Sequence, residues 1–235
     1  MDKTPISIII PVYNEGKIFE SNSKRIMEYI KRRYGRYEII LGDNGSTDST
    51  QERGKELSKR FKNIRFIRLE KRGIGLALKE MIKRARFENI FFLPIDMSFD
   101  LKFIDDALPL LKQYDIVVGS KVAKGSKTKR PLTRRIFSFF FNLLVNLFFG
   151  LGISDTQSVK AFSRAKIKKI NEKIKSEDLF FDVELLVKSK KASLKIIEIP
   201  VICKDIRKTH YNILIESAKA FLKILNFWFE SKIKQ

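Results

Sequence analysis

The sequence predicts an α/β fold in which a central, mostly parallel sheet is flanked by helices. Short apolar runs alternate with segments of helical periodicity through the first half of the chain, a pattern typical of successive β–α–β units. Polar clusters follow several of these runs, at the places where strands should end. No Gly/Ser-rich linker, low-complexity tract or internal repeat divides the 235 residues. A single α/β domain with an elaborated second half is therefore expected.

The elements of the first half follow from these runs. The expected strands are residues 6–10, 37–41, 64–69, 90–93 and 116–118. Pro11 should stop the first strand, because proline cannot donate to a β-ladder. An apolar stripe predicts the first helix, at Ile18, Ile26, Tyr29 and Ile30. After a turn at 42–47, Asp48 with Gln51 three residues later indicates a capped helix start. Two further helices are expected at 76–85 and 101–111.

The character of the chain changes after Gly119. A basic loop at 121–135 leads into a Phe-rich helix of about 133–150, which is followed by a turn at 150–155. A helix at 181–190 and a strand at 196–201 come next. The domain is predicted to span 1–211, including the Phe-rich helix, and 212–235 should form a C-terminal amphipathic helix. Its expected apolar face is Leu214, Ala218, Phe221, Leu225 and Trp228, with Lys219, Lys223 and Lys232 elsewhere on its surface.

The composition points to anionic partners. Lys and Arg number 48 against 27 for Asp and Glu, which gives a net charge of +21. This balance suits phosphate-rich ligands, nucleic acid or an anionic membrane surface, although a compositional habit of the organism would also produce it. Nucleic acid is disfavoured, because no RNP-like aromatic strand or zinc-ligand spacing is present. Cys203 is the only cysteine and no signal peptide precedes the first strand, so a reducing, cytoplasmic location is expected.

The Phe-rich helix has two interpretations. Residues 136–153 carry no charge and just reach the length needed to span a bilayer, but Asn142, Asn146 and two glycines interrupt them. A helix that is apolar on nearly every side must be buried in protein or in lipid. It is thus either a core helix or, with the C-terminal helix, one of a pair seated at the membrane interface. The second interpretation predicts peripheral attachment.

Three polar clusters follow expected strands: residues 11–15, 42–48 and 94–98. In a parallel sheet, ligands bind beyond the carboxyl ends of the strands. The Asx-rich turn around Asp43 and Asn44 can hydrogen-bond a base and ribose, and Asp96 can coordinate a cation that bridges phosphates. Each cluster alone is also compatible with a purely structural turn. Their occurrence at successive strand ends favours a nucleotide site.

Several segments carry a family resemblance. Residues 7–15 (SIIIPVYNE) and 38–48 (EIILGDNGSTD) resemble the opening of glycosyltransferase family 2. The second half resembles the dolichyl- or polyprenyl-phosphate sugar synthases of that family in an ordered set of motifs. These are Gly119-Ser120-Lys121, Arg134 with Ser138, Asp155-Thr156-Gln157-Ser158, FDVELL at 181–186 and EIPV at 198–201. The resemblance covers residues 7–208.

The resemblance implies a GT-A fold and an inverting transferase that moves a hexose from a GDP- or UDP-hexose onto a dolichyl or polyprenyl phosphate. It assigns the nucleotide to Pro11, Tyr13, Glu15, Asp43, Asn44, Arg72 and Gly73. It assigns Mg²⁺ or Mn²⁺ to Asp96 and Ser98. It assigns the acceptor phosphate to Lys121, Arg134, Ser138 and Arg207, which with Asp96 form the expected catalytic set. The protein would act on the inner, cytoplasmic face of the membrane.

The expected chemistry needs no Ser/His/Asp constellation. A phosphate monoester has a second pKa of about 6, so its attacking oxygen is already largely ionised at neutral pH. The protein must instead align two anions and neutralise the departing diphosphate, which is work for Arg, Lys and a cation. His210, the only histidine, is accordingly expected in an exposed loop.

The sequence also departs from the family pattern. Pro94 replaces the first aspartate of the usual Asp-x-Asp metal motif, and Asn44 replaces the second aspartate of the base-contacting turn. Ile74 stands in place of a common lysine, and Val159 where a Gly-aromatic pair is usual. Two alternatives therefore stay open: a family 2 transferase with another acceptor, and a non-catalytic homologue that binds nucleotide or membrane.

Overall fold

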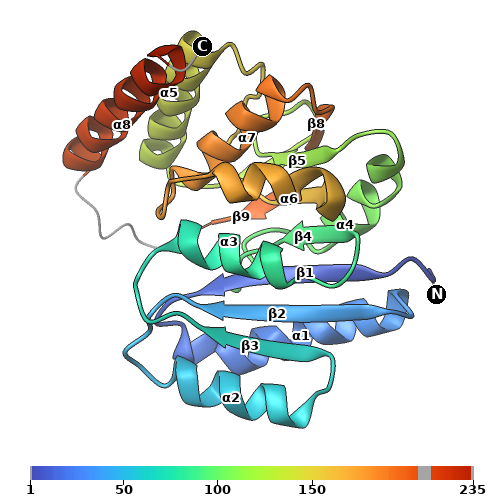
Figure 1. Cartoon of the computed structure of the whole chain (residues 1–235). Helices are drawn as coiled ribbons and strands as arrows, with labels where there is room; N and C mark the ends of the chain where they lie inside the picture. Colours follow the sequence, from blue (N-terminus) through green and yellow to red (C-terminus); the bar gives the residue numbers. More distant parts are fainter. Residues whose placement is uncertain (1, 206–212, 234–235) are drawn as a thin grey trace.

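The computed structural model describes residues 2–205 and 213–233, and within the last helix the side chains of 219–230 and 232. A seven-stranded sheet forms its centre, in the order β3-β2-β1-β4-β7-β5-β8 (Figure 1). The strands are β1 (Ile6–Val12), β2 (Tyr37–Asp43), β3 (Ile64–Arg68), β4 (Asn89–Phe92), β5 (Ile116–Ser120), β7 (Lys160–Ser163) and β8 (Ile196–Pro200). Only β7 runs antiparallel to its neighbours within this sheet. The expected mostly parallel α/β fold is confirmed.

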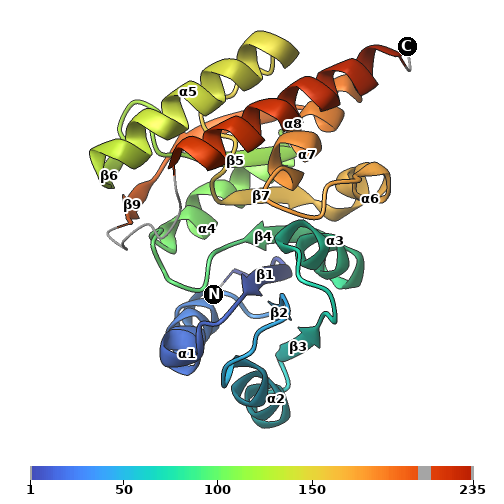
Figure 2. The ribbon, with the colours of Figure 1, turned by 90° about the vertical axis from the view of Figure 1, so that its left-hand side faces the viewer.

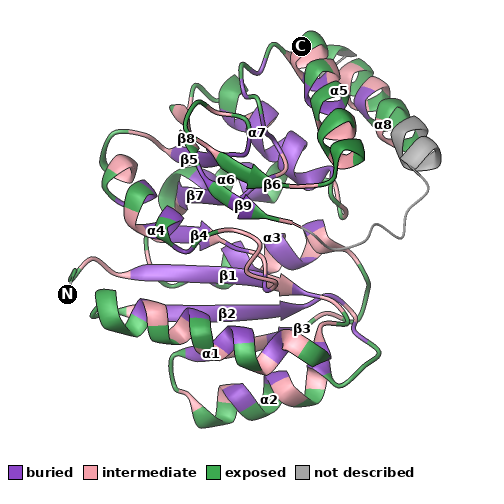
Figure 3. Ribbon diagram, turned by 180° about the vertical axis from the view of Figure 1, so that it is seen from behind, coloured by how far each residue is buried: buried purple, intermediate pink, exposed green. Residues whose placement is uncertain are grey.

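Helices cover both faces of the sheet. Seen along the strands, α1 (Gly16–Arg33) and α4 (Lys102–Ala107) lie on one side, and α3 (Ile74–Arg84) and α6 (Arg164–Lys173) on the other (Figure 2). The central strands β1 and β2 are buried along nearly their whole length, as Figure 3 shows. Their side chains alternate between two apolar cores, with Ile8 in one and Ile9 in the other. Near-continuous apolar strands are what a sheet covered on both faces requires.

The remaining elements lie around the main sheet. Helix α2 (Thr50–Arg60) packs beside α1, and α7 (Phe181–Lys191) is almost wholly buried. A short parallel pair, β6 (Lys127–Lys129) and β9 (Ile202–Lys204), lies outside the main sheet. Helices α5 (Leu132–Phe149) and α8 (Ile213–Ile233) lie side by side at one end of the molecule (Figures 1 and 2). The predicted domain boundary at 211/212 lies outside the described residues.

Some expected element boundaries were wrong. Strand β1 continues through Pro11 to Val12, because β4 already ends opposite Ile9 and Pro11 pairs only with β2. The helix expected at 101–111 stops at Ala107, and a 3₁₀ turn (Pro109–Lys112) follows, since proline breaks the α-helical bonding. Asp48 is not the helix N-cap, which is Ser49. The Asp48 carboxylate nevertheless accepts a bond from the Thr50 amide at 3.0 Å.

The two end helices pack against each other and expose apolar surface. The rings of Phe148 and Trp228 lie 5.7 Å apart, and those of Phe149 and Phe227 lie 5.3 Å apart. Only Phe141, Asn142 and Val145 of α5 are buried, so the core-helix interpretation holds for one narrow face. The opposite face exposes a stripe at Leu132, Ile136, Phe139, Phe140, Leu143 and Leu147. This set is called the α5 stripe below, and Figure 3 shows that much of α5 is exposed.

Helix α8 also presents apolar residues on two sides. Ala220, Ile224 and Phe227 face the protein core, rather than the expected face that contains Phe221. Phe221, Leu222 and Phe229 are exposed. Among the described residues, α5 alone is long and apolar enough to cross a membrane by length and composition, with a mean hydropathy of 1.3.

Candidate functional site

The candidate site lies beyond the carboxyl ends of β1, β2 and β4. Because β1 sits between β2 and β4, the three loops that follow these strands meet at one edge of the sheet. The first two loops are bonded to each other. The Asn14 amide donates to Ser46 Oγ at 2.9 Å, and the Thr47 amide donates to Asn14 Oδ1 at 2.8 Å. Asn14 has a φ of 52°, a left-handed conformation that asparagine tolerates, so the chain turns sharply here.

Asp43 is the last residue of β2, and Asn44 follows it directly at this edge of the sheet. Asp43 is completely buried, and its Oδ1 accepts the Ser46 amide at 2.9 Å. Its Oδ2 is buried with no hydrogen-bond partner among the described residues. Asn44 Oδ1 accepts the backbone N–H of Gly73, which ties the second loop to the start of α3. An unmatched buried acceptor is costly in a folded protein, so Asp43 Oδ2 marks a place where a ligand donor would be favourable.

The loop before α3 completes this side of the site. The Arg72 guanidinium lies 4.3 Å from the centre of the Tyr13 ring, a cation–π contact between two predicted nucleotide residues. Gly73 has no room for a side chain, because a Cβ there would lie 2.6 Å from the carbonyl oxygen of Glu177. That same carbonyl accepts the amides of Gly75 at 2.9 Å and Leu76 at 3.3 Å. Residue 177 thereby caps α3 and fixes the Arg72–Gly73 loop.

Pro11 and Glu15 frame the same edge. Pro11 is half-buried near the end of β1. Glu15 precedes α1, and its amide donates to Thr50 Oγ1 at 3.0 Å. The structure thus brings together all seven residues predicted for the nucleotide.

The predicted metal loop follows β4. Asp96 is half-buried, and its Oδ1 accepts the Ser98 amide at 2.9 Å. Within the described ranges, no group of three or more His, Cys, Asp or Glu side chains is arranged to hold a metal. The donor set is therefore one carboxylate with a neighbouring hydroxyl. Magnesium commonly binds through one or two carboxylates, substrate phosphates and water, so this set fits a metal that arrives with a diphosphate.

Lys121 follows β5 and is buried. Its ammonium lies 2.7 Å from Asp155 Oδ2 and donates to the Gln157 carbonyl at 3.0 Å. Burial lowers the pKa of Lys121, Asp155 opposes that shift, and the positive charge of Arg130 adds to it. The side chain thus already has close partners within the protein. Direct contact of Lys121 with an acceptor phosphate stays a prediction.

Arg134 and Ser138 lie in the first turns of α5, as expected for residues four apart on one helix face. Arg134 Nη1 lies 2.5 Å from Asp205 Oδ1. Arg130 joins them, with its Nε 3.5 Å from Asp205 Oδ2 and its Nη1 3.5 Å from Ser138 Oγ. We call Arg130, Arg134, Ser138 and Asp205 the acceptor cluster. Arg207 and His210 lie outside the described residues.

Sequence reasoning missed the acidic partners of these cations. Asp155 and Asp205 pair with predicted acceptor residues, and Lys160 forms a fully buried ion pair with Asp182 at 2.8 Å. Burial raises the pKa of Asp182, and the charge of Lys160 counteracts the rise. Two of these aspartates belong to segments already recognised by resemblance, at 155–158 and 181–186. Only the fold reveals which lysine each aspartate meets.

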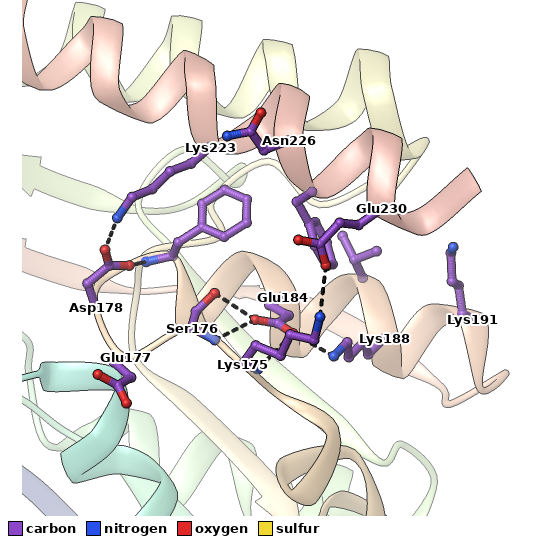
Figure 4. A pocket seen from close by; sticks show the side chains of 13 residues that line it. Lys175, Ser176, Glu177, Asp178, Glu184, Lys188, Lys191, Lys223, Asn226 and Glu230 are labelled. Carbon is purple, nitrogen blue, oxygen red and sulfur yellow. Dashed lines mark hydrogen bonds and ion pairs between the residues drawn. The ribbon is translucent and has the colours of Figure 1, made fainter. Parts of the chain in front are cut away.

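A cavity of about 530 Å³ lies elsewhere, between the segment 175–180, α7 and α8 (Figure 4). Lys223 of α8 pairs with Asp178, and Lys175 pairs with Glu230 at 3.0 Å. Of the predicted nucleotide, metal and acceptor residues that the structure describes, none lines this cavity. Its wall nevertheless includes Glu177, whose carbonyl caps α3.

This geometry agrees with the comparison to known families. The model of Glycosyl transferase family 2 matches residues 7–170. The chain belongs to glycosyltransferase family 2. The family resemblance predicted from the motifs is thus confirmed, as is the assignment of the chain as a glycosyltransferase.

Relatives of this family 2 chain include two proteins named dolichyl-phosphate beta-glucosyltransferase. Dolichyl-phosphate beta-glucosyltransferase of Saccharomyces cerevisiae is 27% identical over 91% of the chain and 71% of the relative. The enzyme of the same name from Dictyostelium discoideum is 29% identical over 86% of the chain and 67% of the relative. Glycosyltransferase AglD of Haloferax volcanii is 25% identical over 97% of the chain, which spans only 38% of AglD.

Solved structures confirm the GT-A fold. Glucosyl-3-phosphoglycerate synthase from Mycobacterium tuberculosis, in complex with phosphoglyceric acid, superposes with a TM-score of 0.68 at 18% identity, covering 95% of this chain and 79% of that one. The same synthase with Mn²⁺, uridine diphosphate and glucosyl-3-phosphoglycerate gives a TM-score of 0.65 at 19% identity, covering 94% and 77%.

Proposed function

We propose that this family 2 glycosyltransferase moves a hexose, with inversion, from a UDP- or GDP-hexose onto a dolichyl or polyprenyl phosphate at the cytoplasmic face of a membrane. The observation that carries the proposal is the acceptor cluster. Two arginines and a serine gather at the start of α5, and the exposed face of that same helix is the apolar α5 stripe. An anion site at the N-terminal end of an exposed apolar helix suits a phosphate attached to a long hydrocarbon chain.

The donor would bind at the edge formed by the first loops. Asp43 Oδ2 offers a buried acceptor for a base or ribose donor, and Asn44 fixes the loop beside it. Arg72 lies on the face of Tyr13, where its charge is available to a diphosphate. Structures of this fold that carry uridine diphosphate or UDP-glucose support a nucleotide donor.

A divalent metal would bind with the donor. Asp96 would supply the carboxylate and Ser98 a neighbouring hydroxyl, with Mg²⁺ or Mn²⁺ completing its ligands from diphosphate and water. Such an ion supplies charge neutralisation at the departing diphosphate. The Mn²⁺ in the similar synthase structure supports this assignment.

The transfer itself requires alignment more than proton transfer. An ionised oxygen of the lipid phosphate forms a bond to the anomeric carbon. The bond from that carbon to the diphosphate oxygen breaks, and the nucleoside diphosphate leaves with the electron pair. Because the phosphate is already largely ionised at neutral pH, no general base is needed. Arg134 and Ser138 would hold the attacking phosphate, and Lys121 and Arg207 are proposed to assist.

Peripheral attachment to the membrane would bring the site close to the lipid phosphate acceptor. The α5 stripe and the exposed residues of α8, Phe221, Leu222 and Phe229, form the surface proposed to enter the headgroup layer. The net charge of +21 would favour an anionic leaflet. The relatives named dolichyl-phosphate beta-glucosyltransferase support a lipid phosphate acceptor for this chain.

A transfer assay tests the proposal. The protein is incubated with a polyprenyl phosphate in anionic vesicles, Mg²⁺ and a panel of labelled UDP- and GDP-hexoses, and the lipid phase is then extracted. Label in the lipid phase is expected for one donor, and Arg134→Ala should remove it without weakening donor binding. Label on a water-soluble phosphorylated acceptor supplied in a parallel incubation, with none on the lipid, would indicate another acceptor. Donor binding without any turnover would indicate a non-catalytic homologue.

A further inference from the structure

Asp205 occupies the centre of the acceptor cluster. Its Oδ1 lies 2.5 Å from Arg134 and its Oδ2 lies 3.5 Å from Arg130. All three side chains are largely buried, with exposed fractions of 19% for Asp205, 21% for Arg134 and 13% for Arg130. Two guanidinium groups this close and this buried repel each other unless an anion lies between them. Asp205 is the anion that the described chain supplies.

The Asp205 carboxylate does not satisfy every hydrogen-bond donor of the acceptor cluster. Arg130 Nε is buried and makes no hydrogen bond within the described part of the chain, although Asp205 lies 3.5 Å away. The contact from Arg130 Nη1 to Ser138 Oγ, at 3.5 Å, is also long. A carboxylate has two oxygens, whereas a phosphate monoester presents three at its free end. A phosphate would therefore reach both arginines and the serine together, which the carboxylate does not.

The backbone around Asp205 is held in place. The Asp205 amide donates to the Lys129 carbonyl at 3.0 Å, and the Lys204 amide donates to the Ser98 carbonyl at 2.8 Å. The first bond fixes the residue to β6, and the second fixes β9 to the predicted metal loop. A rotation of the Asp205 side chain would thus vacate the cluster without disturbing either strand pairing.

We propose that Asp205 is an internal stand-in for the acceptor phosphate, and that Arg130 is a further ligand of that phosphate. The proposal rests on the proposed function, since it concerns the same acceptor site. In the free protein the carboxylate neutralises the two arginines. A phosphate monoester dianion displaces it and gains the buried Arg130 Nε as a donor. Acceptor affinity is then the difference between two anions that compete for one place.

The substitution Asp205→Asn tests this competition, because it removes the charge and keeps the shape. Binding of inorganic phosphate and of a short-chain isoprenyl monophosphate is measured by calorimetry. We expect both to bind on the order of tenfold more tightly than to the wild type, which corresponds to about 1.4 kcal/mol. The KM for a lipid phosphate acceptor should fall while the KM for the donor stays unchanged. Unchanged or weaker phosphate binding would overturn the proposal, because Asp205 would then only orient the arginines.

Two arginine variants provide the matched comparison. Arg130→Gln should weaken binding of inorganic phosphate at least tenfold, in the wild type and in Asp205→Asn alike. Arg135→Gln, which changes an exposed residue of α5, should leave binding unchanged. Equal losses in both variants would show a general charge effect and would exclude Arg130 as a ligand. If Asp205→Asn has a low melting temperature, Asp205→Ser provides a second uncharged variant. It is also expected to bind phosphate more tightly than the wild type.

The probes also separate this inference from the proposed function. Binding of inorganic phosphate needs no transfer reaction, so tighter binding in Asp205→Asn supports the stand-in even if no lipid is glycosylated. Conversely, sugar transfer to lipid without tighter phosphate binding in Asp205→Asn would support the proposed function and reject the proposed role of Asp205. The isoprenyl monophosphate should bind more tightly than inorganic phosphate or glycerol 3-phosphate. Equal affinities would overturn the assignment of a lipid ligand.

Discussion

Asn44 connects two loops that are far apart in the sequence. Its side-chain oxygen accepts the amide of Gly73, so it holds the loop after β2 against the loop before α3. The amide side chain can serve this role and leave its NH₂ group for a base or ribose. Asn44 is therefore expected to act on donor affinity through the position of the Arg72–Gly73 loop.

We predict that Asn44→Leu raises the KM for the nucleotide sugar about tenfold and changes kcat little. A base or ribose contact is made equally in the ground state and the transition state, so its loss affects binding rather than turnover. The lost bond to Gly73 should also lower the free energy of unfolding by about 1 kcal/mol. Steady-state kinetics and chemical denaturation measure the two effects. A fall in kcat at constant KM would contradict this role.

Asp96 should be the main protein ligand of the divalent ion. We predict that Asp96→Ala lowers kcat at least a hundredfold and leaves the melting temperature close to wild type, because the side chain is half-buried in a surface turn. In Pro94→Asp, a second carboxylate should tighten Mn²⁺ binding as measured by calorimetry. Full activity of Asp96→Ala in excess chelator would remove the metal from the mechanism.

The residues of the site were predictable only in part. Asp43 ends a strand, Tyr13 and Asn44 follow strands, and Gly73 precedes a helix, so their convergence follows from the topology of a parallel sheet. The partners of Lys121 and Arg134 could not be predicted in this way. Asp155 and Asp205 lie far along the chain from them, and only the fold decides which carboxylate meets which cation.

At the scale of elements, the segment 175–180 is held by one buried carboxylate. Glu184 of α7 accepts the amides of Lys175 at 2.9 Å and Ser176 at 2.8 Å, and it pairs with Lys188 at 2.5 Å (Figure 4). Burial alone would raise the pKa of Glu184. Hydrogen bonds from Lys188, Ser176 and the two backbone amides outweigh burial and hold the pKa below its ordinary 4.5.

We predict that Glu184→Gln lowers the free energy of unfolding by about 2 kcal/mol at pH 7. A carboxyl group whose pKa is depressed by folding stabilises the folded state above its unfolded pKa. That contribution is lost as the pH falls from 4.5 through the folded-state pKa. The difference between the two proteins should thus shrink below pH 4.5. Urea denaturation between pH 7 and pH 3 measures it, and a constant difference would show that shape rather than charge is responsible.

The α5 stripe separates membrane binding from folding. We predict that Phe139→Ser with Leu147→Ser, which are 63% and 76% exposed, reduces flotation with anionic vesicles at least tenfold and leaves the melting temperature unchanged. Phe141→Ser on the buried face of the same helix should instead lower the melting temperature. Equal flotation of the exposed variant and the wild type would place the membrane contact elsewhere.

Elements were predictable where apolar runs were long. The strands and helices of the first half and the helices at 133–150 and 181–190 agree with the structure within a few residues. Strands β6 and β9 have only three residues each, too few for a pattern to appear, and β6 is exposed. Strand β7 and helix α6 were not predicted. β7 is short and begins with Lys160, a charge that is buried only because Asp182 meets it.

For the molecule as a whole, charge and apolar surface should act together. We predict that binding to vesicles requires anionic lipid and weakens severalfold between 50 mM and 500 mM salt, since the net charge of +21 is screened over the Debye length. Flotation with neutral vesicles is the control and should be weak at every salt concentration. Salt-independent binding would indicate that apolar insertion alone is sufficient.

Strand β7 has a consequence for the way in which the protein is made. It separates β4 from β5 in the sheet, although both are synthesised before it. While a ribosome is still adding residues 121–159, β4 and β5 therefore have no strand to join them, and each exposes an unpaired edge. Unpaired edges on a nascent chain invite pairing with other chains. The first four strands can assemble early, but β5 joins them only when the antiparallel β7 arrives, and β8 is added after that. Folding of the second half should accordingly be delayed until late in translation.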